Sequence, residues 1–250
     1  MNLSDSNFSD CESDLSDPDF FSYRYRAIGT FFQGIIFVVG VLGNAMVVLV
    51  VSRVRALHSP TNCYLVSLAI ADSVVLVASV PNEILSYYLV GNQWVWGDVG
   101  CSLFIFCQNL GINASSLSLV AFTVERYIAI CHPMTAHKMC TTGRAKKITL
   151  AVWLTATVYC SPWLALTVTR PLKYRGYPDA RECVFRWPRN QYLIVFFTDL
   201  VMFYVIPLVL SCILYCLISL TIVNRKVVSA EGNKRPKMLL DSTNTHSKTK

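Results

Sequence analysis

The stretch VERYIAICHPM, residues 124–134, places two charged side chains, Glu125 and Arg126, at the end of a long apolar run. From Val99 to Val124 that run contains no ionisable group apart from two cysteines. A charge at the bilayer centre costs about 2.5–3.5 kcal/mol on insertion scales, and nearby water or an opposite charge lowers that cost. We therefore interpret Glu125 and Arg126 as a charged pair at a membrane edge, where water is near.

A second polar group, Asp72, lies in the middle of the apolar stretch LVSLAIADSVV. A lone carboxylate at membrane depth needs a hydrogen-bond partner, a cation or a proton. One interpretation is a structural hydrogen bond to Asn44, in VLGNAMVVLV, and to nearby backbone. The other is a site for a monovalent cation such as sodium, and the two interpretations are compatible.

Polar residues of the run that ends at Arg126 fall along one line of a helix. At about 100° per residue, Gln108, Ser115 and Arg126 lie within roughly 20° of each other, along about 27 Å of helix. Such a stripe faces other helices rather than lipid. Asn109 and Asn113 form another pair one turn apart, which indicates either hydrogen bonds between helices or a polar pocket open to the outside.

The remaining reactive residue types are not arranged for catalysis. Four histidines lie at or beyond helix ends without metal-ligand spacing, and no Ser–His–Asp set or phosphate-binding glycine loop is visible. The sequence therefore predicts no enzyme and no bound metal. The net charge of +7 comes mainly from segments that flank apolar runs, so it indicates membrane topology rather than nucleic-acid binding.

Five apolar segments must position these residues. Hydrophobic residues make up 54% of the 250 residues, and they gather in blocks as long as the roughly 20 residues that span a bilayer. Pro81, Pro162 and Pro207 lie inside these blocks, where each frees a backbone carbonyl. The sequence predicts an all-α membrane protein with helices over Ala27–Ser52, Thr61–Leu89, Val99–Cys131, Lys147–Val168 and Gln191–Val223.

Lysine and arginine near the helix ends predict the orientation. The bases that follow the first, third and fifth helices place residues 224–250, a basic segment of disordered composition, in the cytosol. Residues 1–26, an acidic tail of disordered composition, then lie outside, and residues 27–223 hold the helices. The loop 169–190 carries six bases and opposes this assignment by charge alone, but connectivity places it outside.

Glycosylation sequons and cysteines also indicate which segments lie outside the cell. Asn2 and Asn7 begin N-glycosylation sequons, although such triplets also arise by chance in a serine-rich tail. Cys101, at the outer end of the third helix, and Cys183, in the loop 169–190, both face an oxidising compartment, where a bond between them would pin the loop over the bundle. The alternative partner is Cys11 of the tail.

Taken together, these features resemble a rhodopsin-like (class A) G-protein-coupled receptor. The matching pieces are GNAMVVLV around Asn44, LAIAD ending at Asp72, Trp94, Cys101 with Cys183, ERY at 125–127, Trp153, Pro207 and Tyr215. Within that family, PTNCYLVSLAIAD (60–72), LGINASS (110–116), FTVERYIAICHP (122–133) and RAKKI (144–148) are most similar to thyrotropin-releasing-hormone receptors. The resemblance implies a seven-transmembrane architecture in the plasma membrane, of which this chain holds the first five helices.

The resemblance also implies a role for the charged pair. In the family, the residue at Glu125 pairs with that at Arg126 in the inactive state. On activation the arginine turns inward, the sixth helix swings out and Tyr215 approaches the arginine. The implied partner is a heterotrimeric G protein of the Gq type, and the further residues that match this switch and its G-protein contact are Tyr127, Pro133 and Met134.

Peptide recognition is implied at the outer end. Gln108 and Asn113 match the releasing-hormone pocket, whereas Asn109 stands where those receptors carry a tyrosine that contacts the peptide. Replacing that aromatic anchor by an amide changes stacking and hydrogen bonding, and the basic loop 169–190 favours an acidic peptide. We therefore expect a related amidated neuropeptide as the ligand rather than the vertebrate tripeptide.

The chain ends at Lys250, before the family's sixth and seventh helices and the CWxP and NPxxY motifs that they carry. Two interpretations are open: an incomplete sequence of a signalling receptor, or a truncated isoform that does not signal and regulates a full-length partner. A small transporter subunit with Asp72 as its ion site is a more remote alternative, because no internal repeat is visible.

Overall fold

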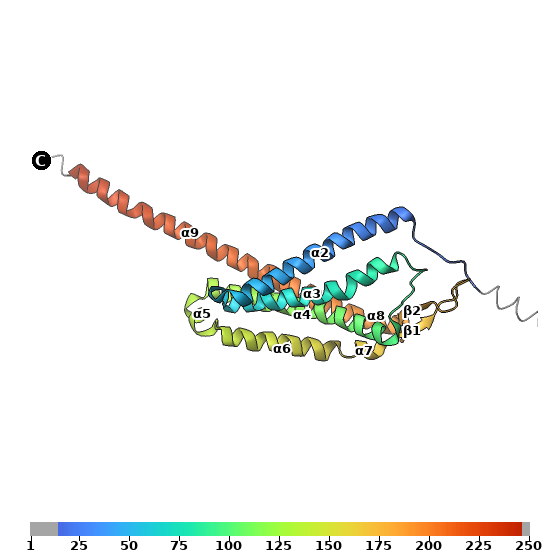
Figure 1. Ribbon diagram of the computed structural model, residues 1–250. Coiled ribbons are helices and arrows are strands. Elements are labelled where there is room, and N and C mark those ends of the chain that lie inside the picture. The colour runs from blue at the N-terminus through green and yellow to red at the C-terminus, as the bar shows by residue number, and fades with distance from the viewer. Residues whose placement is uncertain (1–14, 247–250) are drawn as a thin grey trace, which may run out of the picture.

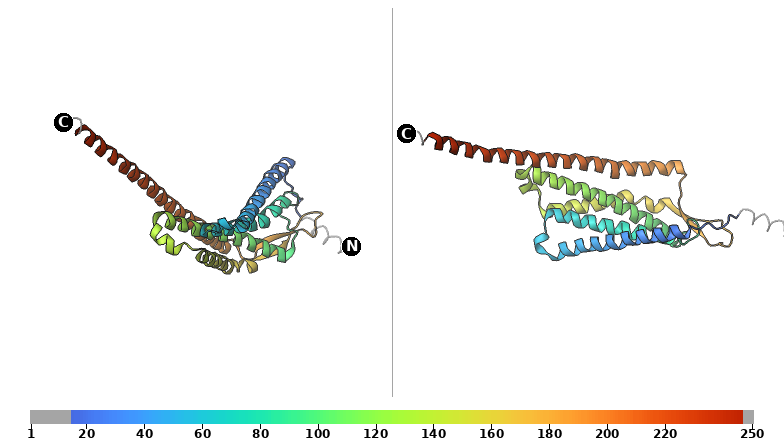
Figure 2. Two further views of the ribbon diagram at one scale, coloured as in Figure 1. Left: turned by 60° about the vertical axis from the view of Figure 1, so that its left-hand side comes forward. Right: turned by 90° about the horizontal axis from the view of Figure 1, so that it is seen from above.

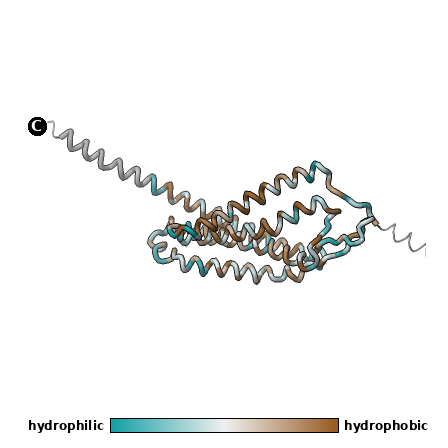
Figure 3. Tube along the Cα trace, viewed as in Figure 1, coloured by the Kyte–Doolittle hydropathy of each residue, from teal (hydrophilic) through white to brown (hydrophobic). Residues whose placement is uncertain are grey.

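A computed structural model describes residues 15–246 of the chain, with side chains as far as Lys226. In this part, five helical spans are long and apolar enough to cross a membrane, and hydrophobic residues follow their length in Figure 3. The spans form an elongated bundle with a β-hairpin at one end, and α9 extends past the other (Figure 1, Figure 2). The elements are α2 (Tyr23–Arg53), η1 (Arg55–Leu57), α3 (Pro60–Ser86), α4 (Gly97–Cys131), α5 (Pro133–Met139), α6 (Thr142–Cys160), α7 (Trp163–Leu166), β1 (Thr167–Pro171), β2 (Arg181–Phe185), α8 (Arg189–Leu200), the π-helix η2 (Val201–Val205) and α9 (Ile206–His246).

Polar caps fix where the helices begin. The Ser22 hydroxyl accepts a hydrogen bond from the Tyr25 N–H at the start of α2. Ser59 caps α3 in the same way, with Pro60 in the first turn, and Thr141 caps α6. These side chains satisfy N–H groups that have no partner within the first helical turn.

Each of the five predicted segments overlaps one of the five spans. A clear difference lies at the C-terminal end of the fourth segment. The fourth was expected over Lys147–Val168, but α6 ends at Cys160 and Val168 belongs to β1. Pro162 explains the difference, because proline lacks an N–H and its ring clashes with the preceding helical turn. Pro81, by contrast, is accommodated inside α3.

The N-terminal tail, expected to be disordered over residues 1–26, follows a defined path from residue 15 onward. The Ser16 N–H donates to the Lys173 carbonyl at 3.1 Å, and the Arg175 N–H donates to the Ser16 carbonyl at 3.0 Å. Asp17 forms an ion pair with Arg175 at 3.3 Å. The acidic tail therefore lies against the basic loop, a pairing across 158 residues that composition does not reveal. The described residues do not include Asn2, Asn7 and Cys11.

The C-terminal segment also differs from expectation. Residues 224–246 were assigned to a disordered stretch, whereas α9 continues through them to His246 (Figure 1). A long apolar helix precedes this segment, and extending an existing helix costs far less than nucleating a new one.

The fifth span contains a π-helical turn, η2, directly before Pro207. Because Pro207 has no N–H, the carbonyl of Phe203, four residues earlier, lacks its usual helical donor. The Ser116 hydroxyl of α4 donates to this carbonyl at 2.5 Å. The carbonyl that the proline was expected to free is thus satisfied by a neighbouring helix, as the interior of a membrane requires.

Helix α4 lies at the centre of the bundle and packs against α3, α6 and α9. Small side chains allow the close approach: Ala71, Ala114 and Ala156 are fully buried and form one core cluster, covered by Leu110 and Trp153. Such small-residue contacts are the usual way in which membrane helices pack without a hydrophobic driving force between them.

Gly111 occupies the tightest contact between α4 and α3. A Cβ atom there would lie 2.5 Å from Val75 Cγ2 and 2.9 Å from the Ala71 carbonyl oxygen. We expect Gly111→Ala to push the helices apart and to lower the free energy of unfolding by about 1–3 kcal/mol. Equilibrium unfolding in mixed micelles measures this loss.

Gly34→Ala in α2 is the matched control, because nothing lies within 4 Å of the Cβ that it adds. Its stability should be unchanged or higher, since alanine favours a helix over glycine by up to about 1 kcal/mol. Equal losses in the two variants would contradict the close contact of α3 with α4.

Candidate functional site

Asp72 lies in a cavity of about 640 Å³ between α2, α3, α4 and the η2–α9 segment. The Ser115 hydroxyl donates to Asp72 Oδ1 at 2.5 Å, so the polar stripe of α4 meets this half-buried carboxylate. Asn44 lines the same cavity, but the hydrogen bond expected between it and Asp72 is absent from the described structure. Ser211 also lines the cavity, and its buried hydroxyl has no hydrogen-bond partner.

At the other polar position of α4, Glu125 and Arg126 do not form the expected ion pair. Glu125 is 6% exposed, and the Arg126 guanidinium lies 5.5 Å from the centroid of the Phe122 ring. The only ion pair between described residues joins Asp17 and Arg175. The physical reason is helical geometry, because consecutive residues project about 100° apart and do not face each other.

Cys140, at the end of α5, is a partner of Glu125 that the sequence did not reveal. Burial is the largest cause that raises the pKa of the Cys140 thiol to about 11, and the nearby Glu125 carboxylate raises it further because its negative charge disfavours the thiolate. The short helix α5 folds this residue back toward α4. Nothing in the spacing of a lone cysteine indicates this proximity, so only the structure reveals it.

The same end of the bundle presents an exposed apolar residue. Pro133 occupies the first turn of α5, and the next residue, Met134, is 86% exposed. Tyr127 Oη lies 3.3 Å from His132 Nε2, just before this helix. Tyr215, on α9, is half-exposed. The residues that the resemblance assigns to a G-protein contact therefore lie in or near this end of the bundle, and the Met134 side chain is exposed there.

At the opposite end, a disulfide joins Cys101 of α4 to Cys183 of β2, with Cα atoms 5.7 Å apart, which confirms the predicted pair. Strands β1 and β2 form an antiparallel hairpin that the all-helical prediction did not include. The Asp98 carboxylate accepts hydrogen bonds from the Thr169 N–H at 3.1 Å and from its hydroxyl at 2.5 Å. The hairpin is thus fixed over α4 by a covalent bond and by a carboxylate.

The three predicted ligand-binding residues differ in exposure and in their hydrogen-bond partners. Gln108 and Asn109 are half-buried, and the Asn109 amide donates to the Ile105 carbonyl of its own helix at 2.8 Å. Asn113 is 2% exposed and donates to Cys160 Sγ of α6 at 3.3 Å. In this structure Asn113 therefore forms a hydrogen bond between helices, which is one of the two interpretations of the Asn109 and Asn113 pair.

Asp199 of α8 is a half-buried acid that was not among the predicted site residues. Both of its carboxylate oxygens are buried beside the Tyr159 hydroxyl of α6. The signal was present, because Asp199 is the only charged residue in Gln191–Val223, and a lone carboxylate inside an apolar segment needs a partner.

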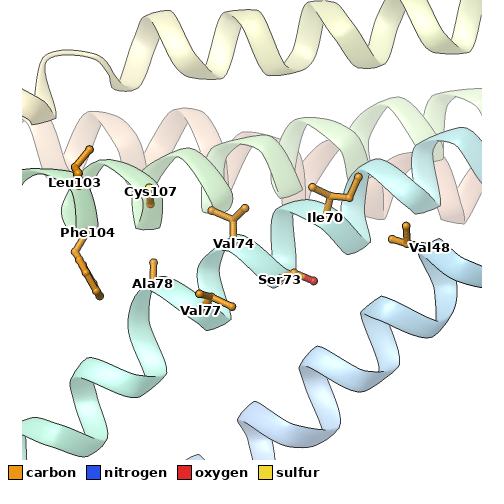
Figure 4. A pocket seen from close by; sticks show the side chains of 9 residues that line it. All are labelled: Val48, Ile70, Ser73, Val74, Val77, Ala78, Leu103, Phe104 and Cys107. Carbon is orange, nitrogen blue, oxygen red and sulfur yellow. The ribbon is translucent and has the colours of Figure 1, made fainter. Parts of the chain in front are cut away.

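A further cavity, of about 530 Å³, lies between α2, α3 and α4 (Figure 4). Its walls are mainly apolar, with Val74, Val77 and Phe104 among them. The Ser73 hydroxyl at its edge is already bonded to the Ala69 carbonyl of the same helix, at 2.7 Å. A space of this kind suits hydrocarbon chains and offers little to orient a polar ligand.

Comparison with known proteins bears on this arrangement. Residues 43–247 match the model of the family described as 7 transmembrane receptor (rhodopsin family). The chain belongs to this family. Its five apolar spans therefore correspond to part of a seven-transmembrane receptor fold, and the relatives that it matches are receptors rather than enzymes.

Individual receptors are also similar. The chain is 46% identical to the thyrotropin-releasing hormone receptor of Gallus gallus over 208 residues. This matched stretch covers 82% of this chain and 51% of that receptor. The chain is 46% identical over 195 residues to the receptor of the same name from Homo sapiens (77% and 48%), and 34% identical over 204 residues to neuromedin-U receptor 1 of Rattus norvegicus (80% and 48%). The chain spans about half the length of the curated relatives it matches.

The contact between Cys140 and Glu125 makes a testable prediction for this receptor chain. Because a raised pKa leaves little thiolate at neutral pH, Cys140 should react with iodoacetamide roughly tenfold to a hundredfold more slowly than an unperturbed thiol. Glu125→Gln removes a negative charge that disfavours the thiolate. The pKa of Cys140 should fall, and its alkylation should accelerate and begin at lower pH.

Mass spectrometry of the Cys140 peptide, over a series of pH values, measures this rate. Glu83→Gln is the control, because Glu83 is exposed and lies in α3 at the hairpin end of the bundle. It should leave the rate unchanged. A Cys140 rate that is the same in Glu125→Gln as in the unmodified chain would contradict the contact.

Proposed function

We propose that the complete receptor binds a short peptide at the hairpin end of the bundle and activates a heterotrimeric G protein of the Gq type at the α5 end. The observation that carries this proposal is Met134, which is 86% exposed in α5, at the end of the bundle opposite the disulfide. An exposed methionine is a flexible apolar contact for a partner. The names of the similar receptors support a peptide as the ligand.

The orientation belongs to the same proposal. A disulfide persists in an oxidising compartment, which supports an extracellular hairpin and a cytosolic α5. The N-terminus is then extracellular in the plasma membrane, and Asn2 and Asn7 are accessible for glycosylation.

We expect the ligand to be an amidated neuropeptide that differs from the vertebrate releasing hormone. Asn109 stands where the releasing-hormone receptors are expected to carry a tyrosine, and an amide offers neither its ring nor its hydroxyl. Binding of that tripeptide at low nanomolar affinity would contradict this part of the proposal.

A sodium ion is proposed as a ligand of the Asp72 cavity. The donor set fits a small hard cation, since the cavity offers the Asp72 carboxylate, the Ser115 hydroxyl and the Asn44 amide. The unpartnered Ser211 hydroxyl supplies a further oxygen. A bound cation would neutralise a carboxylate that is costly to hold within the bilayer.

A second candidate function is regulation of a full-length receptor by this 250-residue chain. The observation that favours it is the large apolar surface of α2, which contains no buried residue and offers a face for other helices. Co-expression should lower the surface level of the full-length receptor. Unchanged surface levels would contradict this alternative.

Met134→Ala tests the proposed coupling surface in the complete receptor, obtained by reading the native transcript past the Lys250 codon. We expect G-protein activation, followed with a Gq biosensor during an amidated-peptide screen, to fall by about tenfold or more, because an apolar anchor at an interface carries much of the binding energy. Peptide binding at the cell surface should not change.

Met139→Ala is the matched control, since Met139 lies at the other end of α5 and is 37% exposed. It should couple almost normally. Full coupling by Met134→Ala, or an equal loss in both variants, would contradict the assignment of this surface.

A further inference from the structure

The hairpin end of the receptor contains a cavity of about 580 Å³ with basic and aromatic walls. Three arginines line it and come from three places: Arg170 on β1, Arg186 directly after β2, and Arg189 at the start of α8. The volume falls in the range of small-ligand sites, about 300–1,000 Å³.

No acidic side chain of the described residues neutralises these arginines. The ion pair of the hairpin loop uses a different arginine, Arg175, with Asp17. Glu182 is the strand partner of Arg170, yet no ion pair or hydrogen bond joins the two side chains. The nearby carboxylate of Asp98 is already engaged by Thr169. Guanidinium groups gathered without counter-charge create a local positive potential that attracts anions.

The aromatic walls are anchored rather than mobile. The rings of Phe185 and Tyr192, which both line the cavity, have centroids 5.0 Å apart. Phe185 also packs on Trp163, which is 2% exposed. Cys183, held by the disulfide, lines the cavity as well. A fixed wall reduces the entropy that a bound ligand must overcome.

Trp187 gives the cavity an exposed aromatic edge, since it is 45% exposed and stands between Arg186 and Arg189 in sequence. An aromatic ring beside guanidinium groups suits a ligand in which an acidic group neighbours an apolar or aromatic one.

Membrane topology does not account for this cluster. Lysine and arginine favour the cytosolic side of a membrane. The cavity instead lies at the end where a disulfide indicates an oxidising compartment. The positive charge at this end therefore opposes the topological bias, which points to a role in binding.

We propose that this cavity binds the acidic part of a peptide ligand, namely two or more carboxylates beside an aromatic side chain, through charge-assisted hydrogen bonds from Arg170, Arg186 and Arg189. This inference rests on the proposed function for the peptide nature of the ligand, and it adds the chemical class of that peptide. Paired N–H groups of arginine match carboxylates better than lysine does.

The test uses the full chain in phosphatidylcholine nanodiscs and two fluorescein-labelled peptides, Gly-Glu-Glu-Phe-Glu amide and its uncharged twin Gly-Gln-Gln-Phe-Gln amide. By fluorescence anisotropy, we expect the acidic peptide to bind about tenfold more tightly or better. Its affinity should fall as salt rises from about 0.1 M to 1 M, because the Debye length shortens from about 10 Å to 3 Å.

Combined Arg186→Gln and Arg189→Gln substitutions should weaken binding of the acidic peptide by about tenfold or more. Arg175→Gln is the control: it removes one positive charge from the same loop, against two in the cavity variant, and Arg175 does not line the cavity. It should change the affinity by less than about twofold. An intact Cys101–Cys183 disulfide and an unchanged unfolding midpoint show that each variant is folded.

Equal binding of the two peptides overturns the proposal, and so does an equal loss in Arg175→Gln and in the cavity variant. Competition by phosphatidylserine added to the nanodiscs would assign the cavity to a lipid headgroup and would also overturn it. If a neutral amidated peptide activates the complete receptor while the acidic peptide fails to bind, the proposed function stands and this inference fails.

Discussion

A polar group inside a bilayer has no water to bond, so its partner must come from the protein. In this chain most partners come from one helix, α4. Short polar side chains on successive faces of α4 reach the helices around it and satisfy polar groups there. The contacts are Ser115 with Asp72, Ser116 with the Phe203 carbonyl, Ser118 with Ser67, and Asn113 with Cys160.

The central position of α4 also joins the two functional ends. Its first turns carry Cys101, which holds the hairpin, and its last turns carry Glu125 and Arg126. Between them Ser116 bonds to the carbonyl that Pro207 leaves free, at a π-helical turn of the kind often found at functional sites. Helix α4 therefore runs without a break from the hairpin end to the α5 end, and its polar contacts hold its neighbours in place.

The sequence predicts this architecture to the extent that the membrane dictates it. Bilayer thickness sets the length of the apolar segments, and oxidation pairs Cys101 with Cys183, so both could be anticipated. Contacts between residues that only folding brings together could not be anticipated from the sequence. Adjacency of Glu125 and Arg126 suggested an ion pair, whereas the helix turns them apart and Cys140 returns to Glu125. Likewise, the tail near Asp17 finds Arg175 only because the hairpin brings the loop to it.

The central claim is that α4 stabilises its neighbours by satisfying their polar groups. Equilibrium unfolding of Ser116→Ala in mixed micelles tests it most directly, beside Ser73→Ala, whose hydroxyl bonds only to Ala69 of its own helix. The account predicts a loss of about 1–3 kcal/mol for Ser116→Ala, because the Phe203 carbonyl is left without a donor, and a loss below about 0.5 kcal/mol for Ser73→Ala. Equally small losses in both variants would contradict it.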